Sequence, residues 1–229
     1  MTPVVVAVDG PAGAGKSTVS RRLAEALGYR YIDTGAMYRV IGVLAVERGI
    51  AFSDSMQLAS LCDATRIDFV ERPNGLRTCA DGRDLSEAIR TVDAAQLASK
   101  VSAVPEVRER LVAQQRAMAA AGGVVMEGRD IGTVVCPDAA VKIFLDAAVA
   151  ERARRRAGDV RRQPTAEDVA RIEQEIAERD ARDRTRAHSP LRPATDAVIV
   201  DTTDKTIDEV VDLLRALVAR RTAALASHT

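Results

Sequence analysis

The stretch "VVVAVDGPAGAGKSTVS", residues 4–20, decides the fold because it places an apolar run directly before a glycine-rich loop and a Lys-Ser pair. Residues 4–8 show no alternation of polar and apolar side chains, which is typical of a central parallel strand buried on both faces. Glycines let backbone amides turn around an anion, and the helix expected from Lys16 directs its N-terminal amides to the same place. The order strand, loop, helix therefore predicts a phosphate-binding loop.

This loop fits the pattern of a glycine, four further residues and Gly-Lys-Ser, which indicates a nucleoside triphosphate as the ligand. Lys16 is expected to reach the β- and γ-phosphates, and the hydroxyl of Ser17 is expected on a Mg²⁺ ion that accompanies ATP. The predicted ATP-binding residues of the loop are Gly10, Pro11, Ala12, Gly13, Ala14, Gly15, Lys16, Ser17 and Thr18.

Length and composition predict one α/β domain, since 229 residues with 47% hydrophobic content can bury a substantial core and carry a small insertion. Lys plus Arg equals Asp plus Glu, at 33 each, so net charge gives no reason to expect a nucleic acid or a membrane as partner. No apolar stretch reaches the roughly 20 residues that cross a bilayer, and no basic, apolar leader precedes the first strand. We expect a cytoplasmic monomer with three free, buried thiols, Cys62, Cys79 and Cys136.

The apolar pattern of the first strand recurs in "GVVMEGRD", "VKIFLDA" and "AVIVDTT", which are separated by helical segments. This βαβ alternation predicts an α/β fold with a doubly wound, five-stranded parallel sheet. Ligands of such sheets bind at the carboxyl ends of the strands, where Arg129 and Asp130 directly follow an apolar run. Short strand-like pieces broken by Pro and Gly within about residues 63–102 indicate an insertion with its own antiparallel sheet.

The densest arginine cluster lies in residues 151–187. Gly158 and Pro164 mark a loop between two helical parts, with Arg161 and Arg162 at its tip, which is the arrangement of a lid that closes over phosphates. The alternative is a solvated helical hairpin whose charges pair with one another on the surface.

One face of the second lid helix changes from apolar to charged along its length. The stripe runs at helical spacing through Val169, Ile172, Ile176, Arg179, Asp183 and Arg186. Buried arginines need a counter-anion, and a single aspartate does not balance two of them, so the pattern predicts a bound anion.

The other classes of phosphate-loop protein fit less well. A GTPase that reads guanine with Asn-Lys-x-Asp is excluded, because the only asparagine of the chain is Asn74. A transport or helicase ATPase needs a strand that ends in Asp-Glu, whereas Ala147 follows Asp146 here. A small-molecule kinase remains, because phosphoryl transfer requires facing anion sites and a lid. A regulatory nucleotide-binding ATPase is the second alternative.

Four motifs in order, "DGPAGAGKST", "YIDTGAMYR", "EGRDIGTVV" and "ERDARDRTRA", resemble those of bacterial cytidylate kinases, which transfer phosphate from ATP to CMP or dCMP. The resemblance covers residues 4 to about 211 and includes the insertion typical of the bacterial type. It implies a nucleoside monophosphate kinase with a core of residues 1–33, 103–150 and 187–229. It further implies an acceptor-binding region at 34–102, with the antiparallel insertion at about 63–102, and a lid at 151–186.

The resemblance also implies roles for residues that bind the acceptor. The CMP phosphate would be held by Arg39, Arg129 and Arg179, with help from Thr34, where relatives often have serine. Cytosine would be read by Ser99, Arg108 and Asp130, since Asp130 accepts from an exocyclic amine that uracil lacks. Asp183 would bind the ribose hydroxyls, with Arg186 close to the nucleotide.

On the donor side, the resemblance implies that Arg152 stacks on adenine and that Arg156, Arg161 and Arg162 clamp the transferring group. The expected catalytic residues are therefore Lys16, Arg129, Arg156 and Arg162. Asp33 has two interpretations, one as the holder of a water on Mg²⁺ and one as the N-cap of the helix that follows it.

Overall fold

The structure, a computed structural model, describes residues 3–73, 75–160, 165–186 and 188–226. The chain forms two compact units. The core unit comprises Met1–Tyr31 and Ala121–Thr229, and the inserted unit comprises Ile32–Ala120. Each unit has a sheet and a hydrophobic cluster of its own.

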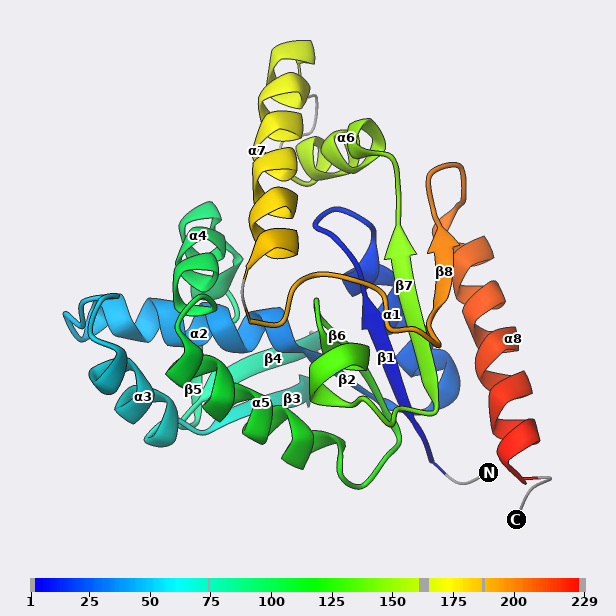
Figure 1. Ribbon diagram of the computed structural model, residues 1–229, viewed down its shortest axis with the longest axis horizontal. Coiled ribbons are helices and arrows are strands. Elements are labelled where there is room, and N and C mark those ends of the chain that lie inside the picture. The colour runs from blue at the N-terminus through cyan, green and yellow to red at the C-terminus, as the bar shows by residue number, and fades with distance from the viewer. Residues whose placement is uncertain (1–2, 74, 161–164, 187, 227–229) are drawn as a thin grey trace. The chain divides into compact units, whose positions relative to one another are not determined.

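A five-stranded sheet organises the core unit, and this confirms the predicted α/β fold (Figure 1). Its strands, in spatial order, are β2 (Arg30–Asp33), β6 (Val124–Glu127), β1 (Val5–Asp9), β7 (Val141–Asp146) and β8 (Val198–Asp201). The central strand β1 pairs in parallel with β6 and β7, and β7 pairs in parallel with β8. This position explains the apolar run, because Val6, Ala7 and Val8 are fully buried.

Two helices cover one side of this sheet, α1 (Lys16–Leu27) and α8 (Ile207–Ala226). Leu23 of α1 and Leu214 of α8 are fully buried in one cluster with Ile143 of β7. A glycine ends α1, because Gly28 adopts a left-handed conformation with φ of 66°. Because β1 and α1 are both packed in the core, the loop between them is held at each end by a buried element.

The segment predicted to form a lid, residues 151–186, falls in two helices that follow the carboxyl end of β7, α6 (Val149–Val160) and α7 (Ala166–Thr185) (Figure 1). Ala153, Ala157, Ile172 and Ile176 form a small apolar cluster between the two helices. Gly158 was expected to mark the loop between the two helices, but it lies inside α6, so the helix extends beyond this glycine. Between β6 and β7, the chain makes a short π-helical turn, η2 (Ile131–Val135).

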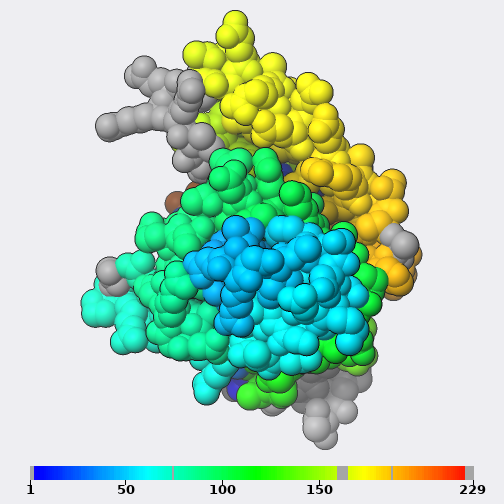
Figure 2. Space-filling view, turned by 90° about the vertical axis from the view of Figure 1, so that its left-hand side faces the viewer, coloured from blue at the N-terminus to red at the C-terminus, as the bar shows by residue number. Residues whose placement is uncertain are grey.

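The inserted unit packs helices beside a three-stranded antiparallel sheet in the order β3-β4-β5. Its elements are α2 (Thr34–Glu47), α3 (Ser55–Asp63), β3 (Ile67–Arg72), β4 (Gly75–Ala80), β5 (Arg83–Asp84), η1 (Ala88–Arg90), α4 (Val92–Val101) and α5 (Pro105–Ala119). Figure 2 shows one face of this unit, coloured from light blue to green, as a closely packed surface.

Helix α5 belongs to the inserted unit, although the sequence analysis assigned residues 103–150 to the core. The physical reason is that Val107 and Leu111 are fully buried in the same cluster as Met37 and Leu58. The apolar face of α5 does not reveal in sequence which of two cores it joins.

The three cysteines are free thiols, as predicted, and Cys62 and Cys79 are buried. The prediction of full burial is wrong for Cys136, which is only half-buried. In the part of the chain that the structure describes, no helix combines the length and the hydropathy needed to cross a bilayer.

Two helical glycines provide a test of packing in each unit. A Cβ on Gly42 of α2 would lie 2.7 Å from the Cβ of Leu97 in α4, whereas a Cβ on Gly158 of α6 would meet nothing within 4 Å. We expect Gly42→Ala to lower the free energy of unfolding by about 1–3 kcal/mol through overpacking. Gly158→Ala is expected to raise it by roughly 0.5–1 kcal/mol through helix propensity.

Urea unfolding followed by circular dichroism would measure both changes, with the wild type as reference. Equal effects of the two substitutions would contradict the close approach of α2 and α4.

Candidate active site

The phosphate loop requires glycine at positions where the backbone and its neighbours leave no room for a side chain. Gly10 has φ of 148°, and a Cβ there would lie 2.0 Å from the carbonyl oxygen of Leu145 on β7. Gly13 has φ of 78°, and its Cβ would lie 2.9 Å from the Cβ of Arg152. Both glycines therefore permit a loop conformation and a close packing that other residues would disrupt.

Lys16 is the first residue of α1 and is almost fully buried. Its Nζ donates a hydrogen bond of 2.6 Å to the carbonyl oxygen of Pro11, across the loop. The next residue, Ser17, is exposed. The lysine is thus fixed inside the loop, while Ser17 is accessible to solvent.

The electrostatic environment of Lys16 is short of negative charge. Burial, together with the positive charges of Arg129 and Arg179, lowers the pKa of Lys16 from 10.5 to about 7. The carboxylates of Glu127 and Asp9 act in the opposite direction but do not offset burial. A phosphate at this place would restore the ammonium form, because an anion favours the charged lysine.

Arg129 and Asp130 follow β6 after the single residue Gly128, at the carboxyl end of the strand, as predicted. The Nε of Arg129 donates to Oδ2 of Asp183 on α7 at 3.3 Å, and its Nη1 donates to the carbonyl oxygen of Gly128 at 3.2 Å. Asp130 is buried. The fold therefore brings together Arg129 and Asp183, which are far apart in sequence.

The inward face of α7 follows the predicted stripe in part. Ile172, Ile176 and Asp183 are buried, whereas Arg179 is half-buried. Asp180 is also buried, and the sequence analysis did not select it. The signal was present, because Asp180 continues the spacing of four residues from Ile172 to Ile176.

Arg186 ends α7, and its side chain turns back onto the chain that follows. Its Nε donates to the carbonyl oxygen of Ser189, and the backbone amide of Leu191 donates to the carbonyl oxygen of Asp183 at 2.8 Å. These bonds fix the end of α7 next to the segment that leads to β8.

The side chain of Arg152, which the resemblance assigns to adenine, is buried beside the phosphate loop. Its side chain is only 2% exposed, and its guanidinium donates to the carbonyl oxygens of Ala12 and Ala147, each at 2.9 Å. It also forms an ion pair of 2.7 Å with the buried Asp180. The guanidinium thus presents no face to solvent, and it connects the phosphate loop at Ala12 to α7 at Asp180.

In the inserted unit, Asp33 caps α2, since its Oδ1 accepts the backbone amide of Ala36 at 3.0 Å. Its Oδ2 accepts from Nη1 of Arg39 at 3.4 Å. Thr34 is buried at the start of the same helix. The N-cap interpretation of Asp33 is therefore confirmed, and the helix start places Asp33 beside Arg39.

The residues expected to read cytosine in this unit lie on α4 and α5. Arg108 of α5 is buried, with its Cζ 5.6 Å from the ring centroid of Tyr38, and its Nη1 donates to the carbonyl oxygen of Ser102 at 3.4 Å. Ser99 of α4 is half-buried, and its carbonyl oxygen accepts from the hydroxyl of Ser102 at 3.0 Å. Ser102 thus connects the surroundings of Ser99 and Arg108.

Arg156 is half-buried on α6, whereas Arg161 and Arg162 lie outside the described residues. Within residues 3–73, 75–160, 165–186 and 188–226, no group of three His, Cys, Asp or Glu residues is arranged to hold a metal ion. The exposed hydroxyl of Ser17 is a hard oxygen donor that suits Mg²⁺ when phosphates supply the other ligands.

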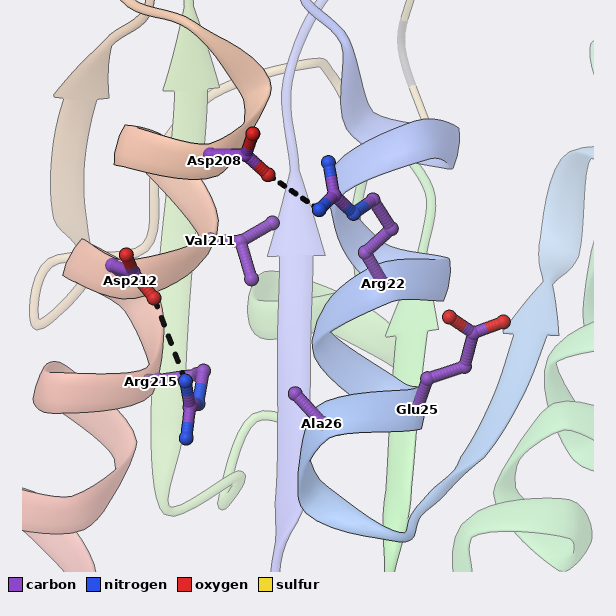
Figure 3. Close-up of a pocket in the computed structure, with 7 residues that line it drawn as sticks. All are labelled: Arg22, Glu25, Ala26, Asp208, Val211, Asp212 and Arg215. Carbon is purple, nitrogen blue, oxygen red and sulfur yellow. Dashed lines mark hydrogen bonds and ion pairs between the residues drawn. The ribbon is translucent and has the colours of Figure 1, made fainter.

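An open groove of about 410 Å³ lies elsewhere, between α1 and α8 (Figure 3). The guanidinium of Arg22 pairs with Asp208 across it, and Arg215 pairs with Asp212 on one helix. Ala26 and Val211 are its apolar lining. Its charges are mostly paired with one another, so the groove lacks the cationic surplus that surrounds Lys16.

Comparisons with known proteins identify relatives of the chain. A family model described as cytidylate kinase matches residues 6–220. The cytidylate kinase of Pelotomaculum thermopropionicum is 49% identical over 215 residues, which cover 93% of this chain and 95% of that protein. The cytidylate kinase of Anoxybacillus flavithermus is 48% identical over 218 residues, with coverage of 95% and 97%.

A solved structure of an uncharacterized protein from Eubacterium ventriosum has a similar fold, with a TM-score of 0.52 and 11% sequence identity. The similarity covers 95% of this chain and 99% of that one. At this identity, the likeness concerns the fold alone.

The pKa of Lys16 predicts proton uptake when a nucleotide binds. Near pH 8, above the pKa of about 7, the free lysine is largely neutral, and bound phosphates shift its pKa back toward 10.5. We expect MgATP binding to take up a fraction of a proton near pH 8, and the uptake to shrink below pH 6. Isothermal titration calorimetry in two buffers of different ionisation enthalpy would measure it.

Lys16→Met is the control, since it removes the titrating group but keeps an apolar stem of similar length. Equal proton uptake by the wild type and Lys16→Met would contradict the assignment.

The buried pair of Arg152 and Asp180 predicts a large loss of stability. Arg152→Ala leaves a buried carboxylate and two carbonyl oxygens without their donor, so the free energy of unfolding should fall by about 3–5 kcal/mol. The matched control is Arg154→Ala on the same helix, whose exposed pair with Glu151 should contribute less than about 1 kcal/mol. Urea unfolding of both variants tests this, and similar losses would overturn the structural role of Arg152.

Proposed function

The chain belongs to the cytidylate kinase family and is an ATP-dependent kinase of CMP, and from this premise we propose how its residues carry out the reaction. The observation that supports the assignment best is the cationic cluster of Lys16, Arg129 and Arg179, in which burial and the two arginines lower the pKa of Lys16 to about 7. Such a cluster suits a site whose ligand brings several negative charges.

We assign the donor phosphates to the phosphate loop, Lys16 and the N-terminus of α1. A phosphate oxygen of CMP attacks the γ-phosphorus in line, the new P–O bond forms, and the bond to the β,γ-bridging oxygen of ATP breaks. Lys16, Arg129 and Arg179 then neutralise charge on the transferring group. No strong general base is needed, because a phosphate monoester is largely ionised at neutral pH.

Mg²⁺ fits the donor side of this site, with Ser17 as its protein ligand, and it would supply neutralisation of the donor phosphates. The carboxylate of Asp33 is used by the N-cap of α2 and by Arg39. We therefore assign Asp33 a contact to the ion through water and no direct ligation. Ser17 presents its hydroxyl from the first turn of α1, which keeps phosphates and ion at one helix terminus.

For the acceptor, we assign the phosphate of CMP to Arg129, Arg179, Arg39 and Thr34. Cytosine is assigned to Asp130, Ser99 and Arg108, and the ribose to Asp183 and Arg186. Asp130 accepts from the exocyclic amine, whereas a carbonyl at the same place in uracil would leave two acceptors facing one another.

In the lid, Arg156 and Arg162 are assigned to the transferring phosphoryl group. Arg152 is assigned a role in holding the loop at Ala12, consistent with its hydrogen bond there, in place of stacking on adenine.

We further propose that dCMP is accepted and that the enzyme acts in pyrimidine nucleotide metabolism in the cytoplasm. It acts as a monomer on ATP and CMP, without nucleic acid or membrane as partner.

ADP production from MgATP, measured separately with CMP, dCMP, UMP, AMP and shikimate, tests the proposed function. Strong turnover confined to CMP and dCMP is expected. Turnover on AMP or shikimate alone would indicate a different small-molecule kinase, and nucleotide binding without turnover would indicate a regulatory protein.

Asp130→Asn should reduce the preference for CMP over UMP by about tenfold or more, since an amide can donate to the uracil carbonyl as well as accept from an amine. The ratio of kcat/KM values for CMP and UMP measures this preference. Asp138→Asn, an exposed aspartate after the same turn, is the control and should leave the ratio unchanged. An unchanged ratio in Asp130→Asn would remove Asp130 from base reading.

A further inference from the structure

Asp9 is a buried carboxylate at the junction of two functional segments. It is the last residue of the central strand β1 and directly precedes Gly10, the first glycine of the phosphate loop. The neighbouring strand β6 runs parallel to β1, with Val8 opposite Glu127, and leads directly into Gly128, Arg129 and Asp130. The two segments thus leave the sheet side by side.

The carboxylate of Asp9 binds the second of these segments through its backbone. Oδ1 accepts the amide of Ile131 and Oδ2 accepts the amide of Gly132, each at 2.8 Å. These amides belong to the two residues that follow Asp130. One side chain therefore fixes the start of η2 immediately after the pair that the proposed function assigns to CMP.

Gly132 makes this approach feasible. A Cβ there would lie 3.4 Å from Oδ2 of Asp9 and 3.3 Å from the aliphatic carbons of Lys142, so the turn is packed on both sides. The backbone before it is held as well, because the carbonyl oxygen of Asp130 accepts the amide of Val134 at 2.8 Å. The backbone at Asp130 is accordingly held through its own carbonyl oxygen and through the two amides that follow it.

Asp9 keeps an acceptor role in spite of its burial. The pKa of Asp9 is raised to about 6, chiefly by burial and to a lesser extent by the carboxylate of Asp130. The amides of Gly132 and Ile131, and the charge of Lys16, act in the opposite direction. At neutral pH the carboxylate is ionised and can accept both amides at once. A neutral carboxamide at the same place could accept only through its single oxygen.

We propose that Asp9 is a positioning residue that holds Arg129 and Asp130 in the orientation that binds CMP, by fixing the amides of Ile131 and Gly132. This inference rests on the proposed function, because it concerns the acceptor half of that site. In this role the carboxylate of Asp9 acts through the two amides it accepts and is assigned no contact to either nucleotide. It makes the base-reading segment depend on the strand that also carries the phosphate loop.

The test compares Asp9→Ala and Asp9→Asn with the wild type by the ratio of kcat/KM for CMP and UMP. This ratio does not depend on the fraction of folded enzyme or on binding of ATP, which both substrates share. We expect Asp9→Ala to reduce the ratio at least fivefold and Asp9→Asn to reduce it less, because one acceptor remains. An unchanged ratio in both variants would overturn the proposal.

Ser86→Ala is the matched control, because the buried hydroxyl of Ser86 also accepts a backbone amide, that of Thr78 at 2.9 Å, in the inserted unit. It should lower thermal stability without changing the ratio. If Ser86→Ala reduced the ratio as much as Asp9→Ala, the effect would be one of general stability and the proposal would fail.

Amide hydrogen exchange measured by NMR separates this proposal from the proposed function. The amides of Ile131 and Gly132 should exchange slowly in the wild type and at least tenfold faster in Asp9→Ala, whatever the substrate. Faster exchange in a protein without CMP turnover would support the positioning role and refute the proposed function. Unchanged exchange would refute the positioning role even in an active CMP kinase. If Asp9→Ala does not fold, Asp9→Asn serves for both measurements.

Discussion

The burial of Lys16 without enough negative charge around it is the constraint on which the rest of the core unit depends. Burial and two arginines, Arg129 and Arg179, lower its pKa to about 7, so the protein alone does not stabilise the ammonium. A polyphosphate supplies the missing charge. The site therefore gains its full electrostatic stability only with a ligand, which is a physical basis for strong phosphate binding.

The carboxylates of the core unit are already used by other partners and do not fill this deficit. Asp9 accepts two backbone amides, Glu127 accepts from the hydroxyl of Tyr31, and Asp183 pairs with Arg129. Asp180 pairs with Arg152 behind the loop. Each of these carboxylates already has a partner in the protein, a backbone amide, a hydroxyl or a cation, so the positive surplus at Lys16 is preserved for the nucleotide.

The sequence predicted the strands and the phosphate loop, whose pattern is local. It did not predict the contacts of long side chains, which can reach several partners. The apolar runs of the strands sufficed to predict the parallel sheet, and the glycines of residues 4–20 sufficed to predict the loop, because burial and φ are set at each position. Arg152 was expected on adenine, yet it reaches Ala12 and Asp180 instead. Asp180 itself was missed, because a choice between adjacent helix positions decides which residue faces inward. The lid tip lies outside the described residues, so its arginines remain predictions.

The buried arginine bonds explain how a glycine-rich loop can be ready for its ligand. Arg152 holds the carbonyl oxygen of Ala12, and the hydroxyl of Thr202 donates to the carbonyl oxygen of Ala14 at 3.3 Å. Arg155 in turn donates to that hydroxyl at 3.0 Å. Because hydrogen bonds from Arg152 and Thr202 already hold these carbonyl groups, less reorganisation of the loop is needed when phosphates bind. The same arginines lie on α6, so the lid region contributes to the shape of the loop through its base, independently of any contact between its tip and the nucleotide.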